Sequence, residues 1–119
     1  MDISDWALIG LGLVVGTGAA FTGLGGGFLI IPILLFLGFT SQRAVGTSFV
    51  AILVIALSAL VAHHKFNNID MKAGLLLGIG GLVGAQLGAR FLEHVSTAQF
   101  RRIFAFVLIA LAVYLLVKK

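Results

Sequence analysis

The chain has 119 residues, of which 61% are hydrophobic and 10% charged, and its mean hydropathy is +1.19. This composition leaves too little polar surface to cover a soluble globule, so we predict a membrane protein. The net charge of +4 is modest, and lipid headgroups and topology explain the basic residues between the apolar runs better than nucleic acid does. The absence of cysteine excludes disulfides, thiolate chemistry and Cys-ligated metals.

Polar residues divide the chain into four apolar segments, which cover residues 6–39, 45–62, 73–92 and 100–117. The N-terminus carries Asp2 and Asp5 instead of a basic stretch, so we expect no cleaved signal peptide. Each of the last three segments has about 18 to 20 residues, which fits a hydrocarbon layer of roughly 30 Å at about 1.5 Å per residue. We therefore predict a single membrane domain, residues 1–119, with three ordinary transmembrane helices.

The first segment, residues 6–39, has an unusual length. As one helix its 34 residues would extend about 51 Å, yet they are too few for two full spans and a turn. The cluster Gly23-Leu24-Gly25-Gly26-Gly27 lies inside it, and glycine adopts backbone conformations that are closed to other residues. We predict a broken or re-entrant pair, from Trp6 to about Phe21 and from Phe28 to about Leu37, hinged on this cluster.

Small residues indicate where helices pack closely. In the third segment they recur every four positions, as Gly74 and Gly78, as Gly80, Gly84 and Gly88, and as Gly81, Ala85 and Ala89. Such stripes let neighbouring backbones approach, so we expect this helix to lie at the centre of the arrangement. Gly12, Gly16 and Ala20 repeat the pattern and make the first half-helix its expected partner.

The basic residues are evenly divided. If the first element returns to its own side, Arg43, Arg90, Arg101 and Arg102 share one face of the membrane, and Lys65, Lys72, Lys118 and Lys119 share the other. An excess of Lys and Arg on one side orients membrane helices, and here that excess is absent. The balance permits insertion in both directions and an antiparallel pair; a weak bias toward one orientation is the alternative.

Several motifs together resemble the sulfite exporter TauE/SafE family of membrane permeases. They are GLGGGFLIIPILLFLGF (23–39), AVGTS (44–48), HHKFNNID (63–70), GGLVGAQLGARF (80–91) and FRRIFAFVL (100–108). The resemblance covers nearly the whole chain and implies an all-α, multi-pass protein of the prokaryotic inner membrane. Members typically carry two related halves, whereas this chain resembles one. It therefore implies a homodimer in which the second copy is inverted.

The resemblance also implies transport of sulfite, thiosulfate or organosulfonates, and the sequence supplies a means to hold an anion. Exposed N–H groups at the start of the second half-helix, together with the positive end of its dipole, favour a negatively charged oxygen. Hydroxyl groups near the start of the next helix and one amide in the third span could add hydrogen bonds. The predicted substrate-binding residues are Gly23, Gly25, Gly26, Gly27, Phe28, Thr47, Ser48 and Gln86.

Each assignment has a structural alternative. The glycine cluster could serve as a hinge alone, Thr47 and Ser48 could bond to their own helix, and Gln86 could tie two helices together. His63 is a candidate proton sensor, whereas we expect no metal site, because neighbouring histidines on a helix point in different directions.

No catalytic arrangement or cofactor motif is present, and the spans contain no Asp or Glu, so we expect no enzyme. The sequence predicts an anion transporter in the lipid bilayer. The alternatives are a structural or regulatory membrane subunit that needs a distinct partner half, and an anion channel.

Overall fold

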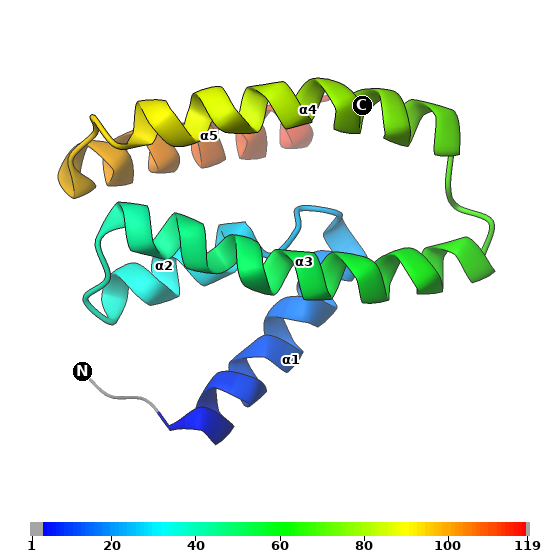
Figure 1. Cartoon of the computed structure of the whole chain (residues 1–119), viewed down its shortest axis with the longest axis horizontal. Coiled ribbons are helices and arrows are strands. Elements are labelled where there is room, and N and C mark those ends of the chain that lie inside the picture. Colours follow the sequence, from blue (N-terminus) through cyan, green and yellow to red (C-terminus); the bar gives the residue numbers. More distant parts are fainter. Residues whose placement is uncertain (1–3, 119) are drawn as a thin grey trace.

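The computed structural model describes residues 4–118. Asp2, which entered the signal-peptide argument, and Lys119, which entered the charge argument, lie outside the described residues. Within this range the chain is entirely α-helical (Figure 1). The helices are α1 (Asp5–Thr22), α2 (Gly27–Phe36), α3 (Ser41–Lys65), α4 (Met71–Leu92) and α5 (Thr97–Val117). All except α2 are long and apolar enough to cross a membrane. The expected all-α, multi-pass membrane protein is confirmed.

The helices extend beyond the apolar segments because polar residues cap them. Thr40 Oγ1 accepts the N–H of Arg43, so α3 begins four residues before the expected position 45. Ser96 and Gln99 form a reciprocal capping box, so α5 begins at Thr97. Such side-chain oxygens satisfy N–H groups that the first helical turn leaves unpaired.

The helices form two layers, with α3 next to α1 and α2, and the α4–α5 hairpin on the other side of α3 (Figure 1). The most extensive helix contacts all involve α3, which packs against α2, α1 and α5. The expectation that residues 73–92 lie at the centre is therefore wrong for one copy of the chain. Helix α4 has no buried residue, and no other part of the described chain lies within 4 Å of a Cβ built on any of its glycines.

The first half-helix also has a different partner from the one predicted. A Cβ built on Gly16 would lie 3.9 Å from Cγ1 of Ile55, so the Gly12–Gly16 side of α1 faces α3 and not α4. The reason lies in the connection: α2 returns along α3 after the break, and this brings α1 to α3 before α4 begins.

The small core lies where α2, α3 and α5 meet. Ile31, Leu34 and Ala44 are buried there, and Phe100 and Phe104 of α5 pack against them. Three hydrogen bonds hold the α4–α5 turn to the start of α3. The Ser41 N–H donates to Thr97 Oγ1 at 3.0 Å, and Gln42 Nε2 donates to the carbonyl oxygens of Leu92 and Val95 at 3.0 and 2.9 Å.

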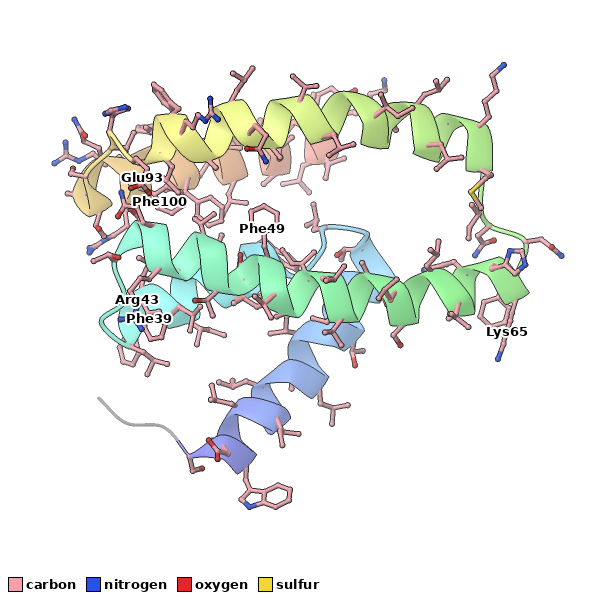
Figure 2. The ribbon with its side chains drawn as sticks, in the orientation of Figure 1. Phe39, Arg43, Phe49, Lys65, Glu93 and Phe100 are labelled. Atoms are coloured by element: carbon pink, nitrogen blue, oxygen red, sulfur yellow. The ribbon has the colours of Figure 1, made fainter. Side chains whose placement is uncertain are left out.

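The basic residues separate by type along the helices. Figure 2 shows Arg43 and Glu93 at one end of the molecule and Lys65 at the other. Because α3, α4 and α5 alternate in direction, the remaining arginines lie at the Arg43 end, in the last turn of α4 and the second turn of α5. The other described lysines, Lys72 and Lys118, lie at the Lys65 end, at the start of α4 and directly after α5. We call these the arginine end and the lysine end.

Candidate functional site: a helix break beside the middle of α3

The chain leaves the helical ladder at the glycine cluster, between Thr22 and Gly27. Gly23, Gly25 and Gly26 have φ angles of +79°, +77° and +89°, a left-handed conformation that side chains with a Cβ rarely adopt. Gly23 ends α1, with its N–H donating to Ala19 O at 2.7 Å. This positive-φ backbone turns the chain from α1 into α2 without a long loop.

Gly26 also brings two helices into close contact. A Cβ built on it would lie 3.1 Å from Cγ1 of Val15 and 3.6 Å from Cβ of Ala19, both on α1. The hinge alternative therefore has a physical basis, because this position needs glycine for packing and for its φ angle. Packing and binding are compatible, since the packed atoms are carbons of α1, whereas the backbone N–H groups are the groups that an anion would contact.

The break lies beside the middle of the longest helix. Cβ atoms built on Gly25 and Gly27 would lie 3.7 and 3.5 Å from the side chain of Ile52, which is close to the centre of the 25-residue α3. Gly26 and Gly27 are buried, and Phe28 is half-buried. A helix that crosses the bilayer would thus hold the break near mid-depth.

The first N–H groups of α2 have few partners. Leu29 N and Ile30 N both donate to Gly26 O, at 3.1 and 2.9 Å. Among the described residues, the four preceding N–H groups, those of Gly25, Gly26, Gly27 and Phe28, make no hydrogen bond of good geometry. These are donors that a helix N-terminus offers to an anion.

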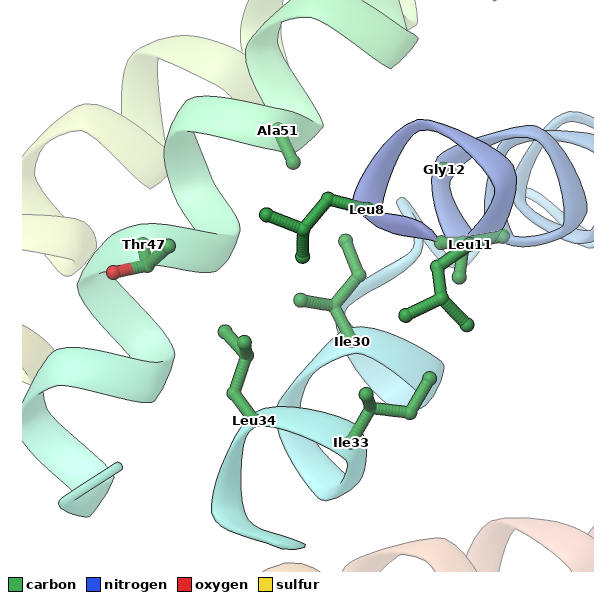
Figure 3. Close-up of a pocket in the computed structure, with 9 residues that line it drawn as sticks. Leu8, Leu11, Gly12, Ile30, Ile33, Leu34, Thr47 and Ala51 are labelled. Atoms are coloured by element: carbon green, nitrogen blue, oxygen red, sulfur yellow. The ribbon is translucent and has the colours of Figure 1, made fainter. Parts of the chain in front are cut away.

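The other predicted site residues lie farther from the break. Thr47 is at the rim of an apolar cavity of about 220 Å³ between α1, α2 and α3, and Figure 3 shows its hydroxyl oxygen turned away from Leu8 and Ile30. Ser48 is buried and donates to Val45 O at 2.7 Å, so it bonds to its own helix as the structural alternative predicted. Gln86 is exposed on α4. Within one copy of the chain, Gly23, Gly25, Gly26, Gly27 and Phe28 therefore lie together at the break, whereas Gln86 does not join them.

A second groove, of about 530 Å³, lies on the other side of the break. Gly23 and Gly25 line it together with His63 from the end of α3 and Asn68 from the α3–α4 linker. The sequence singled out His63 as a candidate proton sensor, but nothing indicated Asn68. Its proximity depends on the linker, in which the Asn68 N–H donates to His63 O at 3.0 Å.

The described residues contain no group of three His, Asp or Glu that could hold a metal ion. Around the break the polar groups are backbone amides, the Thr22 hydroxyl, one imidazole and one carboxamide. This set can exchange hydrogen bonds with a small polar ligand.

Comparison with known proteins identifies the family. Residues 8–119 match the family described as sulfite exporter TauE/SafE. The chain belongs to this family. The resemblance to this family that the sequence motifs indicated is therefore confirmed over almost the full length of the chain.

Individual relatives are named as transporters in general terms. The chain is 34% identical to the probable membrane transporter protein YunE of Bacillus subtilis, over 93% of this chain and 44% of the relative. It is also 34% identical to the probable membrane transporter protein MJ0441 of Methanocaldococcus jannaschii, over 91% and 43%. A third relative, a probable membrane transporter protein of Xylella fastidiosa, is 28% identical over 87% and 41%.

The chain spans less than half the length of these TauE/SafE relatives. No solved structure matches it significantly. The arrangement around the break therefore comes from this structure alone.

Proposed function

We propose that this TauE/SafE protein moves small sulfur-containing oxyanions, of the sulfite, thiosulfate or organosulfonate class, across the membrane and binds them at the start of α2. The observation that carries the proposal is the position of the break, whose unpaired N–H groups lie beside Ile52 in the middle of α3. Backbone leaves the helical ladder at membrane depth only where protein or a water-filled cavity supplies partners. The family description, sulfite exporter, supports the choice of substrate class.

The chemistry at this point suits an anion. The N-terminus of α2 carries the positive end of the helix dipole, and its unpaired N–H groups donate to oxygen atoms without a charged side chain. Helix α2 is entirely apolar, GFLIIPILLF, so no carboxylate on it competes for the donors. A tetrahedral or pyramidal oxyanion can accept several such hydrogen bonds at once.

We also propose that α1 and α2 form a re-entrant pair. Leu8 near the start of α1 and Ile33 near the end of α2 line the same cavity as Thr47, close to the arginine end of α3. At the other end of α1, Ala20 O lies 3.0 Å from Nε2 of His63. These contacts support a pair whose outer ends both point toward the arginine end, with the break between them and the lysine end.

Two copies complete the transporter in this proposal. No other part of the described chain lies within 4 Å of a Cβ built on any glycine of the α4 stripes, although small residues in membrane helices typically allow close packing. A second copy supplies that neighbour. Among the described residues, four arginines at the arginine end and three lysines at the lysine end leave little charge bias, which favours an inverted copy. The alternative is that a distinct partner half packs against α4, because a subunit that needs such a partner would expose the same small-residue stripes.

The substrate site is tested by charge at one position. Gly27 opens α2, and a Cβ there meets only the ends of the Ile52 and Ile31 side chains, at 3.5 and 3.7 Å. Asp and Asn have nearly the same size and shape, but only Asp brings a negative charge to the proposed anion site. In proteoliposomes we expect Gly27→Asp to lower sulfite or thiosulfate flux about tenfold or more relative to Gly27→Asn, which corresponds to about 1.4 kcal/mol.

Gly10→Ala is the matched control for expression and folding, because nothing lies within 4 Å of the added Cβ. Equal flux in Gly27→Asp and Gly27→Asn would contradict the site. A parent protein that moves neither anion would favour the subunit that needs a distinct partner half. Flux that rises linearly with concentration instead of saturating would favour a channel.

Orientation is tested by single cysteines, since the chain has none of its own. Phe66→Cys lies at the lysine end and Ala98→Cys at the arginine end, and both positions are exposed. An antiparallel pair predicts that an impermeant thiol reagent labels each position from both sides of the membrane. Labelling from one side only would rule out the inverted copy.

A further inference from the structure

His63 connects three parts of the chain that are far apart in sequence. Its half-buried ring lies near the end of α3, with Nε2 3.0 Å from Ala20 O in the last turn of α1. Its Nδ1 lies 3.2 Å from Nδ2 of Asn68 in the α3–α4 linker. The same two side chains line the groove at the break, together with Gly23 and Gly25.

These two partners select one form of the imidazole. A carbonyl oxygen only accepts, so the hydrogen in the contact with Ala20 must sit on Nε2. The Nδ2 amide group of Asn68 only donates, so Nδ1 must accept with its lone pair. The neutral ring with its hydrogen on Nε2 satisfies both contacts, and it leaves Nδ1 as the one place where a further proton can bind.

A proton on Nδ1 changes the two contacts in opposite directions. With both ring nitrogens donating, the contact between Nδ1 and Nδ2 of Asn68 is lost unless the amide rotates to present its oxygen. The contact with Ala20 O becomes charge-assisted and gains from the negative end of the α1 dipole. Protonation therefore strengthens the hold on α1 and releases or turns the α3–α4 linker.

We propose that His63 is a proton-binding site that couples protonation to the arrangement of the helix break and the α3–α4 linker. The inference goes beyond anion transport and holds whether or not an anion is moved. The charged or titratable groups around it are His64 and Lys65 on the same helix and Asp70 and Lys72 from the linker and α4. The last turn of α1 has no basic or acidic side chain, and α2 has none.

The tautomer is tested by nitrogen NMR of the full chain, labelled at its histidine rings and held in lipid nanodiscs. The ring signal of His63 is identified as the one that His63→Gln removes, and at pH 8 we expect this ring to carry its hydrogen wholly on Nε2. His64→Gln, which changes the exposed neighbour on the same helix, should leave it in place. A His63 ring with its hydrogen on Nδ1 would overturn the inference, and this measurement uses the parent protein.

The coupling is tested by a spin label at Leu24→Cys, an exposed position inside the break. The label is attached at one pH, and its electron spin resonance line shape is then followed from pH 8 to pH 5, the range in which histidine changes charge. We expect a single transition that His63→Gln abolishes and His64→Gln retains. A transition that persists in His63→Gln would refute the coupling, even if sulfite flux were intact.

Asn68→Asp gives a second variant with a directional result. Its carboxylate accepts from the protonated ring and stabilises the charged form, so the midpoint should move to higher pH by about one unit or more. Asn68→Leu removes the donor to Nδ1 and offers no acceptor to the charged ring, so its midpoint should lie below that of Asn68→Asp. An unchanged midpoint in Asn68→Asp would show that the linker does not contact the ring in the membrane, and would overturn the inference.

Discussion

Gly26→Ala tests two features of the helix break, the left-handed backbone at residue 26 and its close contact with α1. Gly26 combines a φ of +89° with a buried position between α1 and α2. The added methyl group therefore meets two independent penalties. The backbone is left-handed, and the new Cβ would lie 3.1 Å from Cγ1 of Val15.

The size of each penalty follows from general magnitudes. A residue with a Cβ in the left-handed region costs about 1–2 kcal/mol, and an extra carbon in a packed interior costs about 1–3 kcal/mol. Together they predict a loss of about 2–5 kcal/mol in the free energy of unfolding. Gly10→Ala, in the middle of α1 with nothing within 4 Å, should instead gain up to about 1 kcal/mol from helix propensity.

The assay is equilibrium unfolding in mixed micelles, in which the fraction of denaturing detergent is raised for the parent, each single variant and the Gly26→Ala/Val15→Ala pair. Val15→Ala removes the atom that the new methyl group would strike, so the pair should recover the contact part of the loss, about 1–3 kcal/mol, but not the backbone part. A Gly26→Ala protein as stable as Gly10→Ala would refute the structure of the break. Strict additivity in the pair would refute the contact with Val15 alone.

Three further predictions concern the polar contacts at the arginine end, and the same unfolding assay measures them. Ser41→Ala should keep or raise stability by up to about 1 kcal/mol, because Ser41 Oγ is buried without a hydrogen-bond partner among residues 4–118. Thr97→Val should cost about 1–3 kcal/mol, since the Ser41 N–H loses its acceptor; a loss no larger than that of Ser41→Ala would contradict this. Gln42→Leu should cost a similar amount, about 1–3 kcal/mol, because the carbonyls of Leu92 and Val95 lose their donor.

The helix limits were predictable where they depend on the length and composition of one segment alone. The length of residues 6–39 argued against one unbroken helix, and the break between Thr22 and Gly27 lies at the expected glycines. The limits of α3 and α5 were predicted less well, because polar caps at Thr40 and Ser96 extend them past the apolar runs. Hydropathy detects the apolar run, whereas capping depends on individual hydroxyl groups.

The site was predictable only in its local part. Consecutive positions such as Gly25 to Phe28 must lie together, so the sequence could place them at one break. Asn68 reaches the same groove through the turn after α3, and no periodicity in the sequence indicates such a contact. Gln86 is polar inside an apolar span, but its partner depends on which helix α4 meets, and that is a property of the assembly.

Helix α4 carries the packing argument for the proposed second copy. Glycine lets the backbones of two membrane helices approach closely, and the van der Waals contacts between them stabilise the helix pair. Lipid chains do not supply equally close contacts. The stripe of Gly80, Gly84 and Gly88 faces nothing within 4 Å in the described chain, although each glycine weakens a helix by about 1 kcal/mol relative to alanine. A neighbour that packs on this stripe would offset that cost. In the proposed pair, Gly84→Ile should therefore leave the fold of one copy unchanged and dissociate the two copies, which size-exclusion chromatography in detergent would show as a halved protein mass.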